Sequence, residues 1–188
     1  MKNMIKFFAG IVLISTLSSC SYNSLVEKRE AVTGQWANVE TAYQRRADLI
    51  PNIVETVKAG GKYEQETLEK IVQARAEATQ TKVDANNLSQ EEIDKFQAAQ
   101  TNLSRLLLVM EQYPDLKAVQ GYADLRTELS STEDKIAFER KKFNDLVQDY
   151  NASTATFPAL ITAKLFGFTP KGYFKSDAGT EKVPEVKF

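Results

Sequence analysis

Apolar residues recur in alternating steps of four and three along the N-terminal part of the chain, between positions 25 and 57. This spacing places them on one face of a long helix, as in a coiled coil. Pro51 falls inside the pattern, but the apolar positions after it stay in phase, so we expect a kink and not a break. The positions on this face are Leu25, Arg29, Val32, Trp36, Val39, Tyr43, Arg46, Ile50, Ile53 and Val57.

A second and a third helix are predicted after this one. Gly60-Gly61 should end the first helix in a tight turn, because glycine readily adopts the left-handed conformation found after a helix C-terminus. A second helix is expected over about residues 62–83, followed by a polar loop. Ser89 and Glu92 have the spacing of a capping box, which predicts the start of a third helix that continues to about Met110.

A fourth helix is predicted beyond Pro114. The apolar phase of the third helix is lost at this proline, which indicates a true break. The fourth helix should run to about Thr156, and Phe157-Pro158 should end it. Its expected inward positions are Leu125, Leu129, Ile136, Phe143, Val147, Tyr150 and Phe157.

The expected helix lengths predict the architecture. The first and fourth helices have roughly 36 residues each, about 54 Å, whereas the second and third have about 22 residues, near 33 Å. With short connections, the natural arrangement is an all-α, antiparallel up-and-down four-helix bundle with two long helices. Parts of the long helices then lack neighbours, and an apolar segment at 158–174 is expected to cover them. Its apolar residues are Leu160, Ile161, Leu165, Phe166, Phe168, Tyr173 and Phe174.

The two ends of the chain differ from this bundle. Residues 175–188 are polar, and we interpret them as a flexible C-terminal tail. Residues 1–19 have the form of a bacterial lipoprotein signal peptide, with lysines, an apolar run at 7–17 and small residues before Cys20. As a helix the apolar run is about 16 Å long, too short for a hydrocarbon core of about 30 Å. We therefore predict cleavage before Cys20, lipidation of its thiol, and a bundle domain at 20–174.

The predicted lipid also indicates a location. Several acyl chains on one cysteine hold a protein stably at a membrane. Ser21 follows Cys20, in place of the aspartate that is associated with retention in the inner membrane of some bacteria. We therefore expect a lipid-anchored protein of the cell envelope, in the outer membrane and facing the periplasm.

Composition excludes several classes of function. The chain has no histidine, which removes imidazole bases and the triads built on them. Its formal net charge is −1 and becomes more negative once Lys2 and Lys6 leave with the signal, which argues against nucleic acid as a partner. No spacing of Asp and Glu singles out a metal or hydrolytic site. We therefore expect no enzymatic activity, no metal and no cofactor.

Charged residues at one level of the bundle form the candidate site. Arg46 and Arg75 both fall on apolar faces, and counting along the helices brings Glu133 and Asp134 to the same level. Buried arginines need acidic partners, because an unpaired interior charge costs several kcal/mol. The favoured interpretation is an internal ion-pair layer that fixes helix register. The alternative is a cavity that binds or senses a small molecule or an ion.

Several short motifs are distributed along nearly the whole mature chain. They include Tyr22-Asn23, Trp36, the run Gln44-Arg45-Arg46-Ala47-Asp48-Leu49-Ile50-Pro51-Asn52, Ala74-Arg75, Glu111-x-Tyr113-Pro114, Phe143-Asn144, Tyr150-Asn151, Phe157-Pro158 and Phe166-Gly167-Phe168. Together these motifs resemble the LemA family. The resemblance implies an α-helical bundle outside the cytoplasm, attached to a bacterial membrane at its N-terminus. It implies no catalytic residues. The family commonly begins with a transmembrane segment, whereas this chain ends its apolar run at Cys20.

These observations favour a non-enzymatic function. We expect a lipid-anchored scaffold or protein-interaction module, with an envelope protein of unknown identity as its partner. The alternative is the small-molecule or ion sensor that would use Arg46, Arg75 and Glu133. A carboxylate-based hydrolase is a third and weaker interpretation.

Overall fold

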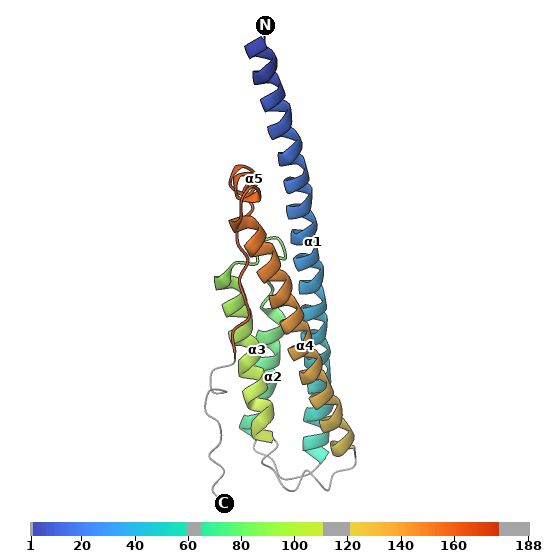
Figure 1. Ribbon diagram of the computed structural model, residues 1–188. Helices are drawn as coiled ribbons and strands as arrows, with labels where there is room; N and C mark the ends of the chain where they lie inside the picture. The colour runs from blue at the N-terminus through green and yellow to red at the C-terminus, as the bar shows by residue number, and fades with distance from the viewer. Residues whose placement is uncertain (1, 60–64, 111–120, 177–188) are drawn as a thin grey trace, which may run out of the picture.

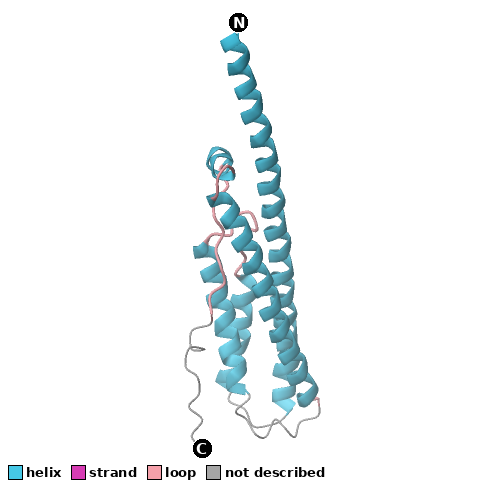
Figure 2. Ribbon diagram, in the orientation of Figure 1, coloured by secondary structure: helices cyan, strands magenta, loops and turns pink. Residues whose placement is uncertain are grey.

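The protein is built of helices in the part that the structure describes. The computed structural model contains α1 (Lys2–Ala59), α2 (Gln65–Gln80), α3 (Gln90–Met110), α4 (Tyr122–Ala155) and α5 (Ala159–Phe166) (Figure 1). It describes the backbone of residues 2–59, 65–110 and 121–176, and side chains within 21–58, 65–66, 68–105 and 121–176. No strand occurs in these stretches (Figure 2), so the all-α prediction is confirmed.

The four long helices lie lengthwise beside one another, in two closely packed pairs. α1 packs on α4, and α2 packs on α3, while α5 contacts both α1 and α4. In Figure 1, α1 ends where α2 and α4 begin, far from the N-terminus, and α5 lies near the end from which the chain starts. We call these two ends of the molecule distal and proximal.

α1 is a single helix of 58 residues. It continues past Pro51, as predicted, and the expected face is buried except at Arg29, whose side chain is 42% exposed, with Val32, Trp36 and Ile50 fully enclosed. The helix begins at Lys2, so it includes the residues of the predicted signal as well as Cys20. Among the residues whose side chains are described, which do not include 1–20, no helix combines the length and hydropathy that a membrane crossing requires.

Some predicted boundaries are corrected or lie beyond what is described. The second helix was predicted over 62–83, but α2 ends at Gln80. The reason is that Val83 and Leu88 turn inward from the following loop and are buried in the core, which draws the chain off the helix axis. The predicted turn at Gly60-Gly61 and the break at Pro114 lie outside the described residues.

Two hydrophobic cores follow one another along the bundle. The proximal one, which we call the aromatic core, is built around Trp36, Tyr43, Phe96, Phe143, Tyr150 and Phe174. The distal one, which we call the aliphatic core, consists of Ile50, Ile53, Val54, Val57, Leu68, Ile71, Ala74, Ala78 and Leu103. The chain therefore uses large rings at one end and small aliphatic side chains at the other.

An extended segment closes the aromatic core. Residues 168–176, which we call the strap, follow α5 and run along α3 and α4. Phe174 packs against both Trp36 and Phe143, with ring centroids 5.9 and 5.5 Å away. The segment after α4 thus contributes to the core, as predicted. Lys175 is hydrogen-bonded to α3 although it was assigned to the tail, and residues 177–188 lie outside the described part.

Several residues that were predicted to be inward are exposed instead. Phe157, expected on the inner face of the fourth helix, is 80% exposed. Ile161, Leu165 and Phe166, expected to cover the core, are 59%, 76% and 57% exposed. The physical reason is that α4 ends at Ala155 and α5 buries another side, with Thr162 and Ala163 against the bundle.

Candidate functional site

Arg46 is the centre of the predicted polar layer, and it is 1% exposed. Its Nη1 donates to Glu133 Oε1 at 2.9 Å and to Ser104 Oγ at 2.5 Å. Its Nη2 donates to the backbone carbonyl and to the side-chain Oε1 of Gln100, at 3.1 and 2.8 Å. The guanidinium carbon also lies 5.0 Å from the centre of the Tyr43 ring. The cation is thus surrounded by groups of the protein itself.

The Arg46 network joins all four long helices. Arg46 belongs to α1, Gln100 and Ser104 to α3, and Glu133 to α4, while Gln100 Nε2 donates to the carbonyl of Ala78 in α2 at 3.0 Å. The network lies where the aromatic core gives way to the aliphatic one. Charged hydrogen bonds of this kind demand definite geometry, so such a layer can set the register of four helices against one another.

Arg75 lies at the same level but binds the backbone instead of a carboxylate. Its Nε donates to the carbonyl of Ala47 at 2.8 Å. This carbonyl is four residues before Pro51, whose nitrogen has no hydrogen to donate in the helix. Arg75 therefore supplies the hydrogen bond that Pro51 removes, which explains why an arginine occupies the inner side of α2 and how α1 continues past its proline.

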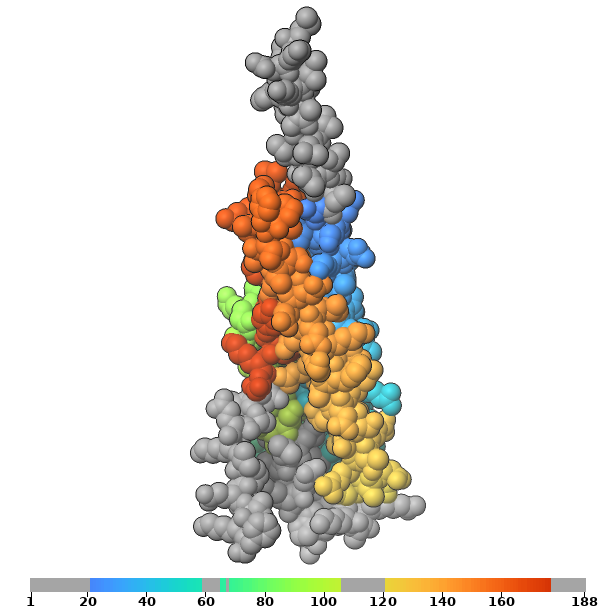
Figure 3. Space-filling view, viewed as in Figure 1, coloured from blue at the N-terminus to red at the C-terminus, as the bar shows by residue number. Residues whose placement is uncertain are grey.

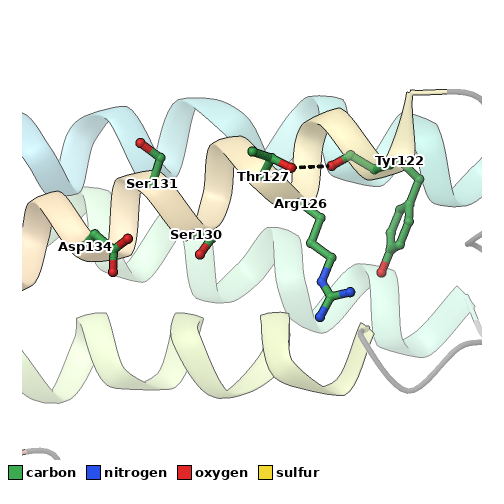
Figure 4. A pocket seen from close by; sticks show the side chains of 7 residues that line it. Tyr122, Arg126, Thr127, Ser130, Ser131 and Asp134 are labelled. Atoms are coloured by element: carbon green, nitrogen blue, oxygen red, sulfur yellow. Dashed lines mark hydrogen bonds between the residues drawn. The ribbon is translucent and has the colours of Figure 1, made fainter.

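Asp134 is separate from this network. It is exposed and lines a surface hollow of about 630 Å³ on α4, together with Tyr122, Arg126 and Ser130 (Figure 4). The only side-chain hydrogen bond drawn there joins Thr127 to the carbonyl of Ala123. The structure thus brings Arg46 and Glu133 together, places Arg75 beside them, and leaves Asp134 outside.

Cys20, the predicted lipidation residue, lies in α1 shortly before the bundle begins. Leu25, five residues later, is already buried. In the part of the chain with described side chains, no group of His, Cys, Asp and Glu has the arrangement of a metal site.

A second buried polar cluster was not predicted from the sequence. Glu139 of α4 is buried against Gln35 of α1, whose Nε2 donates to Glu139 Oε2 at 2.5 Å. Lys135 Nζ lies 2.6 Å from the other carboxylate oxygen. The hydrogen bond from Lys135, followed by the one from Gln35, lowers the pKa of Glu139 below its ordinary value. Gln35 adjoins the seam position Trp36, and Glu139 lies on the seam of α4 itself, between Ile136 and Phe143. Only the packing of α1 on α4 shows that the two side chains meet.

Four side-chain amides hold the strap, and this device was also missed. Each amide donates to the carbonyl and accepts from the N–H of one strap residue, at distances of 2.7–3.1 Å. The amide thus takes the place of a neighbouring peptide group. The pairs are Asn151 with Lys171, Gln90 with Tyr173, Asn144 with Phe174, and Gln97 with Lys175.

The available sequence signal for these amides was their spacing. Gln90 and Gln97 are seven residues apart on α3, and Asn144 and Asn151 are seven apart on α4. Seven residues make nearly two helical turns, so each pair faces the same direction along its helix. Two phased amide pairs that face each other form a ladder that an extended chain can follow.

The strap also carries a buried cation and a close backbone contact. Lys171 Nζ donates to the carbonyl of Asn86 at 2.7 Å, and burial, reinforced by the charge of Arg29, lowers the pKa of Lys171. Gly172 N–H donates to the carbonyl of Leu88 at 2.8 Å. A Cβ at position 172 would lie 2.6 Å from the Cα of Gln90, so this position requires glycine.

Comparison with known proteins places these features in a family context. A family model described as the LemA family matches residues 35–188. The chain is 27% identical over 160 residues to Protein LemA of Metamycoplasma hominis, an alignment that covers 81% of this chain and 70% of that protein.

Magnetosome proteins show a shorter similarity. The chain is 36% identical over 73 residues to Magnetosome protein MamQ 2 of Paramagnetospirillum magneticum, covering 39% of this chain and 27% of that protein. The chain is 35% identical over 72 residues to Magnetosome protein MamQ of Magnetospirillum gryphiswaldense, an alignment that covers 38% of this chain and 26% of that protein. The alignment thus spans about a quarter of each of these two relatives.

Proposed function

Since the chain belongs to the LemA family, we propose that it is a non-enzymatic helical-bundle protein of the bacterial cell envelope. A lipid on Cys20 would hold it there, and it would work by binding another envelope protein. The lengthwise arrangement of α1 to α4 supports an antiparallel up-and-down four-helix bundle as its fold. Ser21 supports placement in the outer membrane, facing the periplasm.

The observation that carries this proposal is the complete enclosure of Arg46. A sensor that used the polar layer would need open space next to its charged groups, so that a ligand could reach them. The guanidinium is instead bound by Glu133, Ser104 and Gln100, and the cavities found among the described residues are lined by other side chains. This enclosure supports a packing role for the layer, so the proposal assigns function to the outer surface.

The proposed orientation makes the distal end the surface for the partner. A lipid on Cys20 would place the proximal end at the membrane, because Cys20 precedes the bundle directly. From residue 20 to Ala59, α1 extends by about 58 Å at about 1.5 Å per residue. A periplasmic protein would meet the distal ends of α1, α2 and α4 first. Lys58, Glu66 and Arg126 are exposed there.

The lipid anchor is tested by metabolic labelling with an alkyne-bearing fatty acid. The wild-type chain should be labelled, and Cys20→Ala should lose the label because the chain has no other cysteine. Label that persists in the variant would refute lipidation of Cys20.

The partner surface is tested by photocrosslinking in intact cells. A photoreactive amino acid at the exposed position 58 or 123, near the distal end, should capture a defined envelope protein. The same residue at the exposed positions 37 and 152, in the proximal half, serves as the matched control. Capture confined to the proximal positions would refute the distal surface.

A further inference from the structure

Exposed apolar side chains gather around α5. Phe157, Ile161, Leu165 and Phe166 are between 57% and 80% exposed and lie within a short stretch of chain. Elsewhere among the described residues, large exposed apolar side chains are isolated, as are Val72 and Phe138. Single exposed apolar residues are ordinary in proteins, but a contiguous group marks a contact surface.

The apolar residues of α5 share one face. Ile161 and Leu165 are four residues apart and therefore lie above one another on the helix. Phe157 lies just before α5 begins at Ala159 and adds an exposed ring next to this helix. Thr162 and Ala163, on another side, are buried against the bundle. Lys164 is exposed beside the apolar face. A short helix with an apolar face and an adjacent lysine has the character of a helix that rests on a membrane surface.

α5 is fixed in place on the bundle. Gly167 ends it in the left-handed conformation, with φ 73°, and the N–H groups of Gly167 and Phe168 both bond to the carbonyl of Ala163. The Tyr22 ring contacts Phe166 and Phe168, with centroid distances of 4.9 and 5.6 Å. The apolar face is thus presented in a constant direction.

The position of α5 matches the level of the proposed anchor. Figure 1 views α5 nearly along its axis while α1 runs in the plane of the picture, so α5 lies across the bundle. Figure 3 shows α5 beside the first described side chains of α1, at the proximal end. Tyr22, which holds Phe166, is two residues after Cys20, or about 3 Å of helix. A helix across the bundle at this level is parallel to a membrane that α1 meets end-on.

We infer that α5 is an interfacial helix that lies on the bilayer, with Phe157, Ile161 and Leu165 in the lipid and Lys164 at the phosphate groups. This inference rests on the lipid anchor at Cys20 that is proposed above. Continuity with the anchor favours lipid over a second copy of the chain, because the acylated cysteine brings this face to the bilayer. A stable protein interface also buries about 800 Å² per partner, more than this small helix face offers.

This second contact has a mechanical consequence. A lipid on a single residue lets the bundle tilt and rotate freely about the attachment point. A helix that lies on the surface beside it restricts both motions, so the distal end is held away from the membrane. α5 thus converts a flexible tether into an oriented one.

The test uses the full-length lipidated protein with a reporter at the membrane. In the mature chain the acylated Cys20 thiol is blocked, so Leu165→Cys adds a single free thiol for an environment-sensitive nitrobenzoxadiazole dye. The protein is reconstituted in vesicles of phosphatidylethanolamine and phosphatidylglycerol that contain a spin-labelled lipid. Ala137→Cys, exposed midway along α4, is the matched control. We expect a blue shift and quenching for position 165 and neither effect for position 137.

A second variant separates docking from mere proximity. Phe157→Ser and Ile161→Ser, added to Leu165→Cys, should reduce the quenching severalfold, while the fluorescence of buried Trp36 stays unchanged and shows that the bundle is folded. Unchanged quenching would overturn the inference, since the tether alone would then bring the dye to the bilayer. Efficient bismaleimide crosslinking of two chains through position 165 would overturn it in favour of a second copy.

The same samples distinguish failure of this inference from failure of the anchor. An acyl label on Cys20 with no quenching at position 165 would refute the interfacial helix and leave the anchored bundle intact. Absence of the acyl label would refute the proposed anchor, and the inference would fall with it.

Discussion

The proximal and distal halves of this bundle are closed in different ways. In the proximal half, Trp36 and Phe143 pack face to face or edge to face with Phe174, and the strap seals the core from outside. In the distal half, α4 contributes Tyr122, Leu125 and Leu129, which pack on the aliphatic core but are only partly buried. The buried residues of α4 begin at Thr132. The Arg46 network separates the two halves.

This difference suggests that one half of a membrane-anchored protein can provide stability while the other half binds the partner. The half nearest the proposed membrane anchor has large rings, paired amides and a covering segment, all of which resist local opening. Among the described residues, the half proposed to meet a partner has smaller side chains and no counterpart of the strap. Segments that bind partners are commonly drawn from the less stable parts of a protein.

The largest expected effect is in the aromatic core. Phe174→Ala removes a ring that is 5% exposed and stacks on Trp36, so it should lower the free energy of unfolding by about 3–5 kcal/mol. Chemical denaturation measures the loss, and the emission of the single tryptophan should shift to the red. Phe166→Ala, at an exposed ring in the same part of the chain, is the control and should change stability little. Equal effects of the two would show that the strap does not close the core.

The boundary between the halves should respond asymmetrically to removal of its two charges. Arg46→Met should cost about 3–5 kcal/mol, because it leaves the buried acceptors of Gln100 and the Ser104 hydroxyl without their donor. Glu133→Ala should cost less, since the Glu133 carboxylate is 45% exposed and Arg46 keeps its bonds to Ser104 and Gln100. Asp134→Ala, the neighbouring exposed position, serves as the control in the same denaturation series. If Glu133→Ala proved the more damaging change, the assigned roles would be reversed.

Pro51 and Arg75 should be coupled in the distal half. Arg75→Leu leaves the Ala47 carbonyl without a partner and should cost about 1–3 kcal/mol. Pro51→Ala restores a backbone N–H that can bond to this carbonyl. In a double-mutant cycle, the cost of Arg75→Leu should therefore fall when Pro51 is alanine. If the effects of the two mutations were additive, the proposal that Arg75 replaces the N–H missing at Pro51 would be contradicted.

The smallest expected effect is the pH dependence of Glu139 in the proximal half. Its pKa is lowered in the folded state by Lys135 and Gln35, so its contribution to stability is present above the ordinary value of 4.5 and lost as the pH falls through the lower folded value. The exposure of Lys135 should limit the contribution to below about 1 kcal/mol. The difference in unfolding free energy between the wild type and Glu139→Gln should shrink in acid. A difference that is independent of pH would contradict this assignment.

The helices could be predicted because their apolar residues repeat locally. The face from Val32 to Val57 is buried as its spacing indicates, and Arg46 lies on it as predicted. The same counting placed Arg75 inward, but it could not show that the partner is a carbonyl freed by Pro51. Counting also failed at Phe157, where the phase of α4 was extended beyond the end of the helix.

The strap could not be predicted in detail because its contacts join distant parts of the chain. Its apolar composition indicated that it would cover the core, and Phe174 does so. The amides of Asn144 and Gln90 have the same local pattern as surface residues, and their function appears only when α3 and α4 face each other. For the same reason the apolar residues of α5 were assigned to the core, since sequence alone does not distinguish a buried face from a face that meets lipid.

Hydrogen–deuterium exchange on the full-length protein in lipid vesicles tests the central contrast between the two halves most directly. Peptides that contain Trp36, Phe143 and the strap should exchange only through global unfolding, because rings and paired amides enclose them. Peptides that contain Leu125 and Leu129 should exchange faster, through local opening of the first turns of α4. Equal protection of α4 along its whole length, or a strap that exchanges as fast as the distal turns, would contradict the account.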